Sequence, residues 1–335
     1  MLEEKLEIFI ITYNRCKSLQ NTLNMLLDKK SPVKSLSITV LDNNSTDKTS
    51  QVVEAIQQKH SNLYYIKNKK NVGLSGNYCK ALELVSKEYY WLIADDDSYN
   101  WSAWSEVEEG INCSADFIIV SNIVPRILKN SKASAILASG WLPSVIIKST
   151  YLSDDVVSYA YNEIATIYPQ ISVSCNLINK GSGNLIKVVS KDIVSYGNKA
   201  EDTRIKDFKS YDFNRIESDK KIIHPRLKFY NYYSNLILAC RNIKDDDVFK
   251  EMLFWLLASK DCHIRINDVW VNIFLGNTSK VLFTNMFVVL PFEYQLKFIL
   301  GFFTAILSFL KKIIKEKRRA LKKSIKQIWK KQNES

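Results

Sequence analysis

The chain has 335 residues, enough to bury the core of one large domain with an appendage or of two modest domains. An apolar fraction of 46% and a charged fraction of 24% are those of an ordinary globular protein and exclude a disordered chain. The net charge of +12 is concentrated in residues 311–331, where eleven Lys and Arg stand against one Glu, so +10 belongs to this segment and +2 to the remainder. The basic element is therefore the C-terminal tail.

The cysteines and the apolar runs limit where the protein can reside. The six cysteines have neither a CxxC pair nor a spacing typical of metal sites, which predicts reduced, mostly buried thiols in a cytosolic protein. The first residues, Met1–Lys5, lack the layout of a secretory signal, so we expect a protein that is not exported. The longest apolar run, Phe298–Leu310, has thirteen residues, fewer than the ~20 that a membrane-spanning helix needs.

The first hundred residues alternate between strand-like and helix-like patterns. Strands are expected at Glu7–Thr12, Leu36–Leu41, Leu63–Ile66 and Tyr89–Ala94, and amphipathic helices at Cys16–Leu27, at Asp47–Gln58 and after Asn77. A further strand is expected at Asp116–Val120. This alternation predicts the α/β class, with a mostly parallel, Rossmann-like sheet sandwiched by helices.

The run Tyr89–Ala94 is wholly apolar and ends in three consecutive carboxylates. Such a run is typical of a strand buried on both faces, and open α/β sheets bind ligands at the carboxyl ends of their strands. Asp95 and Asp97, with one residue between them, can both point toward one divalent cation, and Mg²⁺ or Mn²⁺ would keep positions open for diphosphate oxygens. The alternative to a cation site is that the three Asp residues form an acidic loop that caps the predicted helix Trp101–Glu109.

Polar residues also follow the first two strands. Tyr13 and Asn14 come after the first, and Asp42 and Asn44 come after the second. Right-handed crossovers would bring these loops to the edge that carries the three Asp residues. Each loop alone has a simple alternative explanation, because Asn and Asp are common in turns. Their joint occurrence favours one crevice for a ligand.

Four segments resemble motifs of a known family in order and spacing. They are Ile10–Arg15, Leu41–Asp47, Asn71–Gly73 with Asn77, and Ala94–Asp97. Through them residues 1–125 resemble the inverting, family-2-type glycosyltransferases of the GT-A fold, which use a nucleotide-activated sugar and a divalent metal. The resemblance implies a glycosyltransferase domain at 1–220, with a nucleotide-sugar half at 1–125 and an acceptor half at 126–220. A helical region at 221–292 and a tail at 293–335 would follow.

The resemblance also implies roles for single residues. Thr12, Tyr13 and Asn14 would line the nucleotide base, and Asp42 would bind its imide edge. Asp95 would approach the ribose and diphosphate, and Asp97, with Asp95, would hold Mn²⁺ or Mg²⁺. The rest of the implied nucleotide-sugar set is Arg15, Asn44, Asn71, Gly73, Asn77 and Asp96. A carboxylate only accepts hydrogen bonds, which suits the N–H of uracil or thymine and favours UDP- or dTDP-sugars.

One departure concerns the third motif. Many relatives have an Arg just before the Asn that corresponds to Asn77, whereas this chain has Ser75 and Gly76. Either Arg15 or Lys80 could supply the missing cation for the diphosphate.

The second half gives fewer signals. Gly140–Lys148 resembles the acceptor-side strand of the family, and Trp141 there could stack on a sugar face or belong to the core. Where the family usually carries its base this chain has Gln170, an acceptor-side residue that cannot remove a proton. The candidate bases are Glu163, Asp154 or Asp155, and the pair Glu201 and Asp202, each of which has the alternative of a solvated surface side chain.

The tail combines the apolar run Phe298–Leu310 with a basic amphipathic segment, a combination typical of association with an anionic membrane. We therefore expect residues 298–331 to bind a membrane surface rather than nucleic acid. Asp245–Asp247 repeats the acidic triad only in composition and is expected to start a helix.

Together these observations predict a metal-dependent, inverting glycosyltransferase bound peripherally at the cytoplasmic face of the inner membrane. It would move a sugar to a lipid-linked, polyprenyl-diphosphate glycan acceptor in the synthesis of bacterial surface polysaccharide, O-antigen or capsule. A dehydrogenase is disfavoured because no GxGxxG follows the first strand. The alternative is a membrane-recruited adaptor that binds nucleotide-sugars but is catalytically weak or inactive.

Overall fold

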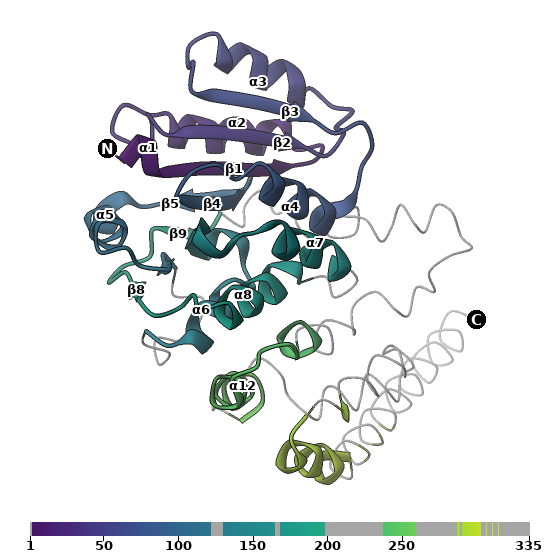
Figure 1. Cartoon of the computed structure of the whole chain (residues 1–335). Helices are drawn as coiled ribbons and strands as arrows, with labels where there is room; N and C mark the ends of the chain where they lie inside the picture. Colours follow the sequence, from purple (N-terminus) through teal and green to yellow (C-terminus); the bar gives the residue numbers. More distant parts are fainter. Residues whose placement is uncertain are drawn as a thin grey trace, which may run out of the picture. The chain divides into compact units, whose positions relative to one another are not determined.

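The computed structural model describes residues 2–121, 130–164, 168–197, 237–258, 287, 288, 290–302, 306, 310 and 314. The chain divides into two compact units (Figure 1). The first consists of Met1–Ile222 and Ala239–Leu253, and the second of Ile223–Leu238 and Phe254–Ser335. The predicted boundaries at residues 125, 220 and 292 stay predictions.

A seven-stranded sheet organises the first unit (Figure 1). Its order is β3 (Leu63–Lys67), β2 (Ser37–Asp42), β1 (Leu6–Thr12), β4 (Tyr89–Ala94), β7 (Val145–Lys148), β6 (Phe117–Ile119) and β8 (Ile186–Val188). β1 runs parallel to β2 and β4, β2 to β3, and β6 to β8, whereas β7 is antiparallel to both β4 and β6. The prediction of a mostly parallel sheet is confirmed.

Helices flank this sheet. They are α1 (Leu2–Lys5), α2 (Cys16–Leu26), α3 (Thr49–Gln57), α4 (Gly73–Glu83), α5 (Trp104–Asn112), α6 (Lys132–Ala138), α7 (Asp154–Asn162) and α8 (Pro169–Asn179). A further helix, α12 (Asp246–Leu253), packs against α6. Short 3-10 turns lie at Trp101–Ala103, Leu142–Ser144 and Ser149–Tyr151, and a π-helical turn of the second unit lies at Phe254–Ala258. The alternation of strands and helices places the loops after β1, β2 and β4 at one edge of the sheet.

Apolar spacing explains the packing of individual elements. Leu19, Leu23 and Leu26 of α2 repeat every three to four residues and are all fully buried. α8 begins at Pro169, whose missing N–H costs nothing in the first turn. In α12, as expected, an acidic residue starts the helix: Asp245 Oδ1 accepts hydrogen bonds from the N–H groups of Asp247 and Val248 at 3.1 and 3.2 Å.

A two-stranded antiparallel ribbon stands beside the main sheet. It pairs β5 (Asp97–Tyr99) with β9 (Val194–Tyr196), so that Asp97 faces Tyr196 and Tyr99 faces Val194. The residue after β9, Gly197, lies against the carboxylate loop so closely that an added Cβ would stand 2.0 Å from the carbonyl oxygen of Asp96. The ribbon therefore fixes a distant part of the chain onto the loop after β4.

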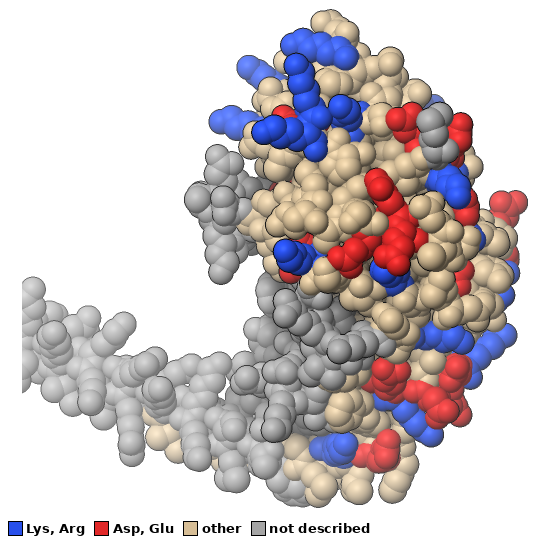
Figure 2. All heavy atoms as spheres, turned by 90° about the vertical axis from the view of Figure 1, so that its left-hand side faces the viewer, with Lys and Arg blue, Asp and Glu red and all other residues tan. Residues whose placement is uncertain are grey.

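Charges of both signs are scattered over the face drawn in Figure 2, where one group of Lys and Arg side chains lies toward the upper left and others lie beside Asp and Glu side chains at the right and in the lower part. This distribution agrees with the small net charge that the sequence leaves outside residues 311–331. That face therefore presents no single continuous basic surface among the described residues.

The second unit includes a helical stretch at 292–302, in which Tyr294 and Phe298 are buried, and Leu290 just before it is buried as well. None of the helices in the described ranges is long and apolar enough to cross a membrane.

Candidate active site

The loops after β1, β2 and β4 meet at one edge of the sheet. Thr12 is the register partner of Asp42 in the β1 and β2 pair, and Ile11 is the partner of Ala94 in the β1 and β4 pair. The last residue of β1 therefore lies between the loop that starts at Asp42 and the loop that starts at Asp95. The structure brings these predicted site residues together.

Asp95 is the most constrained of the three acidic neighbours. Its side chain is buried, and Thr12 Oγ1 donates to Asp95 Oδ2 at 2.5 Å. Arg15 Nη1 donates to Asp95 Oδ1 and to Asp96 Oδ2, each at 3.0 Å. Thr22 Oγ1 of α2 donates to the backbone carbonyl of Asp95 at 2.9 Å. The loop is thus held from β1, from the loop after it and from α2.

Burial raises the pKa of the Asp95 carboxyl to about 6, although the Arg15 guanidinium acts in the opposite direction. Arg15 is the one cation that the described contacts place on two of the three carboxylates. Lys80 lies about two turns into α4, away from the end that starts at the edge of the sheet. Arg15 and Lys80 were the two side chains predicted as the cation for the diphosphate. Of these, Arg15 is the one that contacts the carboxylates.

Asp97 opens β5 and its side chain is only 3% exposed. Among the described residues no three His, Cys, Asp or Glu side chains converge as a metal centre. The donor set nevertheless fits Mg²⁺ or Mn²⁺, because these ions commonly take one or two protein carboxylates and complete their shell with water and phosphate oxygens. A guanidinium already bound by Asp95 and Asp96 indicates that this loop attracts cations.

Asp42 is fully buried, and both its oxygens accept hydrogen bonds from the protein. The N–H of Ser45 donates to Oδ1 at 2.8 Å, and the Tyr65 hydroxyl donates to Oδ2 at 2.5 Å. Burial, together with the Asp42 carboxylate, raises the pKa of Tyr65. Asp42 thus shapes the loop after β2, and its role at a nucleotide base stays a prediction.

A network of amides fixes the third motif against the loop after β2. Asn43 Nδ2 donates to Asn71 Oδ1 at 2.8 Å and to the carbonyl of Gly73 at 3.1 Å. Asn68 Nδ2 donates to Asn43 Oδ1 at 3.2 Å and to Asn77 Oδ1 at 2.9 Å. Gly73 has φ +75°, a conformation that glycine adopts without strain. Asn43 and Asn68 were not predicted from the sequence, where they look like ordinary turn residues.

Asn14 and Asn44 both adopt left-handed backbone conformations, with φ 53° and 68°. The N–H of Asn14 donates to Ser45 Oγ at 2.8 Å, and the N–H of Thr46 donates to Asn14 Oδ1 at 2.7 Å. Because Asn tolerates this conformation better than most residues, the two loops can close against each other. These two loops, after β1 and β2, lie together at the edge of the sheet, where Tyr13 is also located.

The two residues predicted on the acceptor side, Trp141 and Gln170, come together at one turn. Gln170 Nε2 donates to the carbonyl of Gly140 at 3.3 Å, and Trp91 Nε1 of β4 donates to the carbonyl of Pro143 at 2.8 Å. The turn that carries Trp141 is thereby held by α8 and by the central strand.

Two of the candidate bases, Glu163 and Asp155, have basic partners. Glu163 is 5% exposed and accepts from Arg241 through both oxygens, at 2.8 and 3.0 Å, and from Ser172 Oγ at 3.2 Å. Asp155 is exposed, and its pairing with Lys180 at 2.7 Å lowers its pKa. Glu163 and Arg241 thus form an ion pair of the kind that stabilises a fold. Glu201 and Asp202 lie outside the described residues, and the identity of the base stays a prediction.

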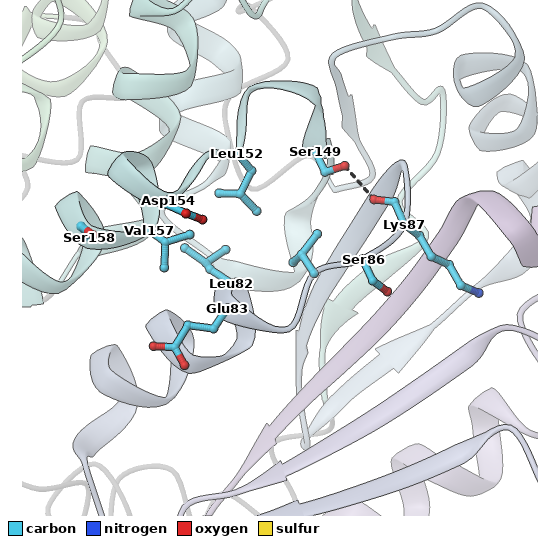
Figure 3. Close-up of a pocket in the computed structure, with 10 residues that line it drawn as sticks. Leu82, Glu83, Ser86, Lys87, Ser149, Leu152, Asp154, Val157 and Ser158 are labelled. Carbon is cyan, nitrogen blue, oxygen red and sulfur yellow. Dashed lines mark hydrogen bonds between the residues drawn. The ribbon is translucent and has the colours of Figure 1, made fainter.

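A cavity of about 380 Å³ lies elsewhere, between the end of α4 and the start of α7 (Figure 3). Its lining includes Lys87 and Ser149, whose side-chain hydroxyl donates to the Lys87 carbonyl at 2.7 Å. Lys87 precedes β4, so the cavity is at the amino end of that strand and Asp95 is at the other. It does not belong to the site described above.

Comparisons with known proteins bear on this site. Residues 7–149 match the model described as glycosyl transferase family 2. The chain is 22% identical to the abequosyltransferase RfbV of Salmonella typhimurium over 71% of this chain and 84% of that protein. It is 29% identical to the GalNAc(5)-diNAcBac-PP-undecaprenol beta-1,3-glucosyltransferase of Campylobacter jejuni over 32% of this chain and 35% of that protein.

A similar solved structure is that of S. aureus TarS 1-349 in complex with UDP-GlcNAc, with a TM-score of 0.55 and 17% identity over 92% of each chain. At this identity the likeness concerns the fold. The fold predicted from the four motifs is therefore confirmed.

Proposed function

We propose that this chain, whose residues 7–149 match the model described as glycosyl transferase family 2, moves a sugar from a nucleoside diphosphate to a lipid-linked glycan acceptor, with inversion at the sugar carbon. The observation that carries the proposal is the meeting of Thr12, Arg15 and the carboxylates of Asp95 and Asp96 at the open edge of the sheet. Ligands of open α/β sheets bind at such an edge.

In this proposal Asp95 and Asp97 hold a divalent ion, Mg²⁺ or Mn²⁺. When bound, the ion neutralises the charge that develops on the departing nucleoside diphosphate. Thr12 and Arg15 hold Asp95 in one orientation, so the loop does not need to reorganise when the donor arrives. Arg15 also carries the positive charge that the third motif lacks, within reach of the same carboxylates.

The donor class follows from Asp42 and from one similar structure. Asp42 suits the N–H of uracil or thymine, and the TarS structure is a complex with UDP-GlcNAc. We therefore propose a UDP- or dTDP-sugar as donor. Each oxygen of the Asp42 carboxylate accepts one hydrogen bond, from Ser45 or from Tyr65, and keeps a second lone pair with which it could accept from the base.

The acceptor class is supported by the names of two relatives. The C. jejuni protein is named for an undecaprenol diphosphate-linked glycan, and the S. typhimurium protein for a sugar transfer. We propose a polyprenyl-diphosphate glycan of a bacterial surface polysaccharide as the acceptor, bound by a protein that is peripheral at the cytoplasmic face of the inner membrane.

The second unit supports attachment to a membrane surface. Large apolar side chains of this unit are exposed at Val288, Phe292, Leu296, Ile299, Leu300, Leu310 and Ile314. Phe292, at 76% exposed, and Leu296 lie on a different face of the helix from Tyr294 and Phe298, which are buried. The eleven Lys and Arg of residues 311–331 follow directly. An apolar stripe next to cationic side chains suits an anionic lipid surface.

Deleting residues 311–335 is expected to weaken binding to anionic vesicles at least about a hundredfold, because each basic residue near such a surface contributes ~1 kcal/mol. The measurement is flotation with vesicles of about 30% phosphatidylglycerol in phosphatidylethanolamine, an anionic surface of the kind that attracts basic segments. Phe292→Glu with Leu296→Glu should also reduce flotation, whereas Tyr64→Glu, at an exposed position of β3, should not. If the deleted protein floats as well as the full chain, the tail is not the anchor.

The enzymatic proposal is tested by release of nucleoside diphosphate. Purified protein with Mn²⁺ is expected to release nucleoside diphosphate from at least one of UDP-glucose, UDP-N-acetylglucosamine and dTDP-rhamnose in preference to GDP-mannose. This release should stop when EDTA removes the metal. If the chain releases no nucleoside diphosphate from any donor, with or without lipid-linked acceptors, it is the nucleotide-sugar-binding adaptor.

A further inference from the structure

The ribbon of β5 and β9 places an unassigned aromatic residue beside the carboxylate loop. Tyr196 is the register partner of Asp97 in this antiparallel pair. Side chains of directly opposed residues emerge on the same face of such a ribbon, with Cβ atoms ~5 Å apart. Tyr196 therefore emerges beside Asp97, although the two residues are 99 positions apart in the sequence.

Tyr196 does not stand alone on that face. Its ring centroid is 4.5 Å from that of Trp141, with 37° between the ring planes. Tyr196 is 59% exposed, while Trp141 is partly buried against the core of the sheet. The pair is thus a fixed aromatic surface, in which one ring is supported from below and the other is open to solvent.

The position of this pair in the fold separates it from the nucleotide side. The predicted base-binding residues follow β1 and β2, which lie on one side of β4 in the sheet order, and β7 lies on the other side. Trp141 comes just before β7, and the antiparallel direction of β7 puts its start at the edge where β4 ends. Asp95–Asp97 therefore lie between the nucleotide side and the aromatic pair.

We propose that Trp141 and Tyr196 form a binding site for a pyranose ring of the acceptor glycan. This inference rests on the proposed function. The C–H face of a pyranose is apolar and its edge is polar, so an exposed aromatic ring supported by a second ring can bind the face and leave the sugar hydroxyls in water. The hydrogen bonds of Trp91 and Gln170 to the turn around Trp141 keep the surface in place.

The site binds the acceptor and not the donor, since a donor sugar stays attached to the diphosphate, which Arg15 would contact on the other side of the carboxylates. Removing the exposed ring should then raise the KM for acceptor more than the KM for donor. The variants are Tyr196→Ala, Tyr196→Phe and Trp141→Ala. The matched control is Tyr64→Ala, because Tyr64 is 51% exposed and lies on β3 at the far edge of the sheet.

Binding is measured directly by saturation-transfer NMR with octyl glucoside, octyl galactoside and octyl N-acetylglucosaminide below their micellar concentrations, and donor turnover by release of nucleoside diphosphate. Tyr196→Ala is expected to lower the apparent affinity for the glycoside that binds about tenfold, and Tyr196→Phe and Tyr64→Ala to change it less than about twofold. Tyr196→Ala should lose more glycoside binding than donor hydrolysis, and the control Tyr64→Ala should hydrolyse donor at the rate of the unmodified chain.

Equal glycoside binding by Tyr196→Ala and the unmodified chain would overturn the site, and so would equal losses in acceptor binding and donor hydrolysis. A third outcome is that the unmodified chain hydrolyses no donor but binds a glycoside, and that Tyr196→Ala loses this binding. That outcome would support the site and overturn the proposed transfer. The two proposals therefore fail separately.

Discussion

Asp97→Asn is expected to lower kcat for sugar transfer by about three orders of magnitude, because Asp97 is in our proposal a charged ligand of the metal, and its loss would remove several kcal/mol of stabilisation from the departing diphosphate. The fold should persist. Asparagine has the shape of the 3% exposed carboxylate, and the backbone of Asp97 keeps its pairing with Tyr196. Activity is measured with the donor that the panel identifies, and Mn²⁺ binding is measured separately by the electron spin resonance of free manganese.

The matched control is Asp28→Asn, a change of the same size at an exposed residue whose carboxylate accepts a local bond from the N–H of Lys30 at 2.8 Å. It should leave kcat within about a factor of two, as expected for a surface substitution. If Asp97→Asn binds Mn²⁺ and turns over like the unmodified chain, Asp97 has no role in holding the metal.

Gly197→Ala is expected to reduce transfer about a hundredfold with little loss of secondary structure. The new Cβ would stand 2.0 Å from the carbonyl oxygen of Asp96, so the ribbon or the carboxylate loop has to move by about 1 Å or more. A displacement of that size at reacting groups costs on the order of a hundredfold in rate. The measurement is kcat/KM for donor and acceptor, with circular dichroism to check the fold.

Gly110→Ala in α5 serves as the comparison. Its Cβ would stand 3.0 Å from Ile118 Cδ1, the end of a side chain that can turn aside, whereas Gly197 faces backbone. Gly110→Ala should therefore cost some stability through overpacking but leave the kcat of the folded protein unchanged. Wild-type kinetics for Gly197→Ala would mean that the close approach to Asp96 has no part in placing the loop.

The central strands were predictable because their signal is local. Tyr89–Ala94 is a short apolar run of bulky residues, and the structure has β4 at those residues with its first five side chains buried. The carboxylates follow at once, so their place at the edge of the sheet could be inferred with no knowledge of the rest of the fold. The acidic start of α12 was equally local.

What escaped prediction depends on pairings between distant segments. β5 and β9 have three residues each, too few for a periodic pattern, and nothing near Tyr196 in the sequence indicates that it faces Asp97. The ion pair of Glu163 with Arg241 joins residues 78 positions apart. A carboxylate that looked like a candidate base therefore has a partner that the sequence could not disclose.

The ribbon joins segments that lie on the two sides of the boundary predicted at residue 125, and this matters for engineering. A chimera of two relatives that is joined at a point between residues 100 and 190 would combine β5 of one parent with β9 of the other. The backbone ladder would form, but the glycine and the tyrosine would come from a different parent than the acidic loop they adjoin. A working hybrid should therefore inherit residues 94–99 and 186–197 from the same parent.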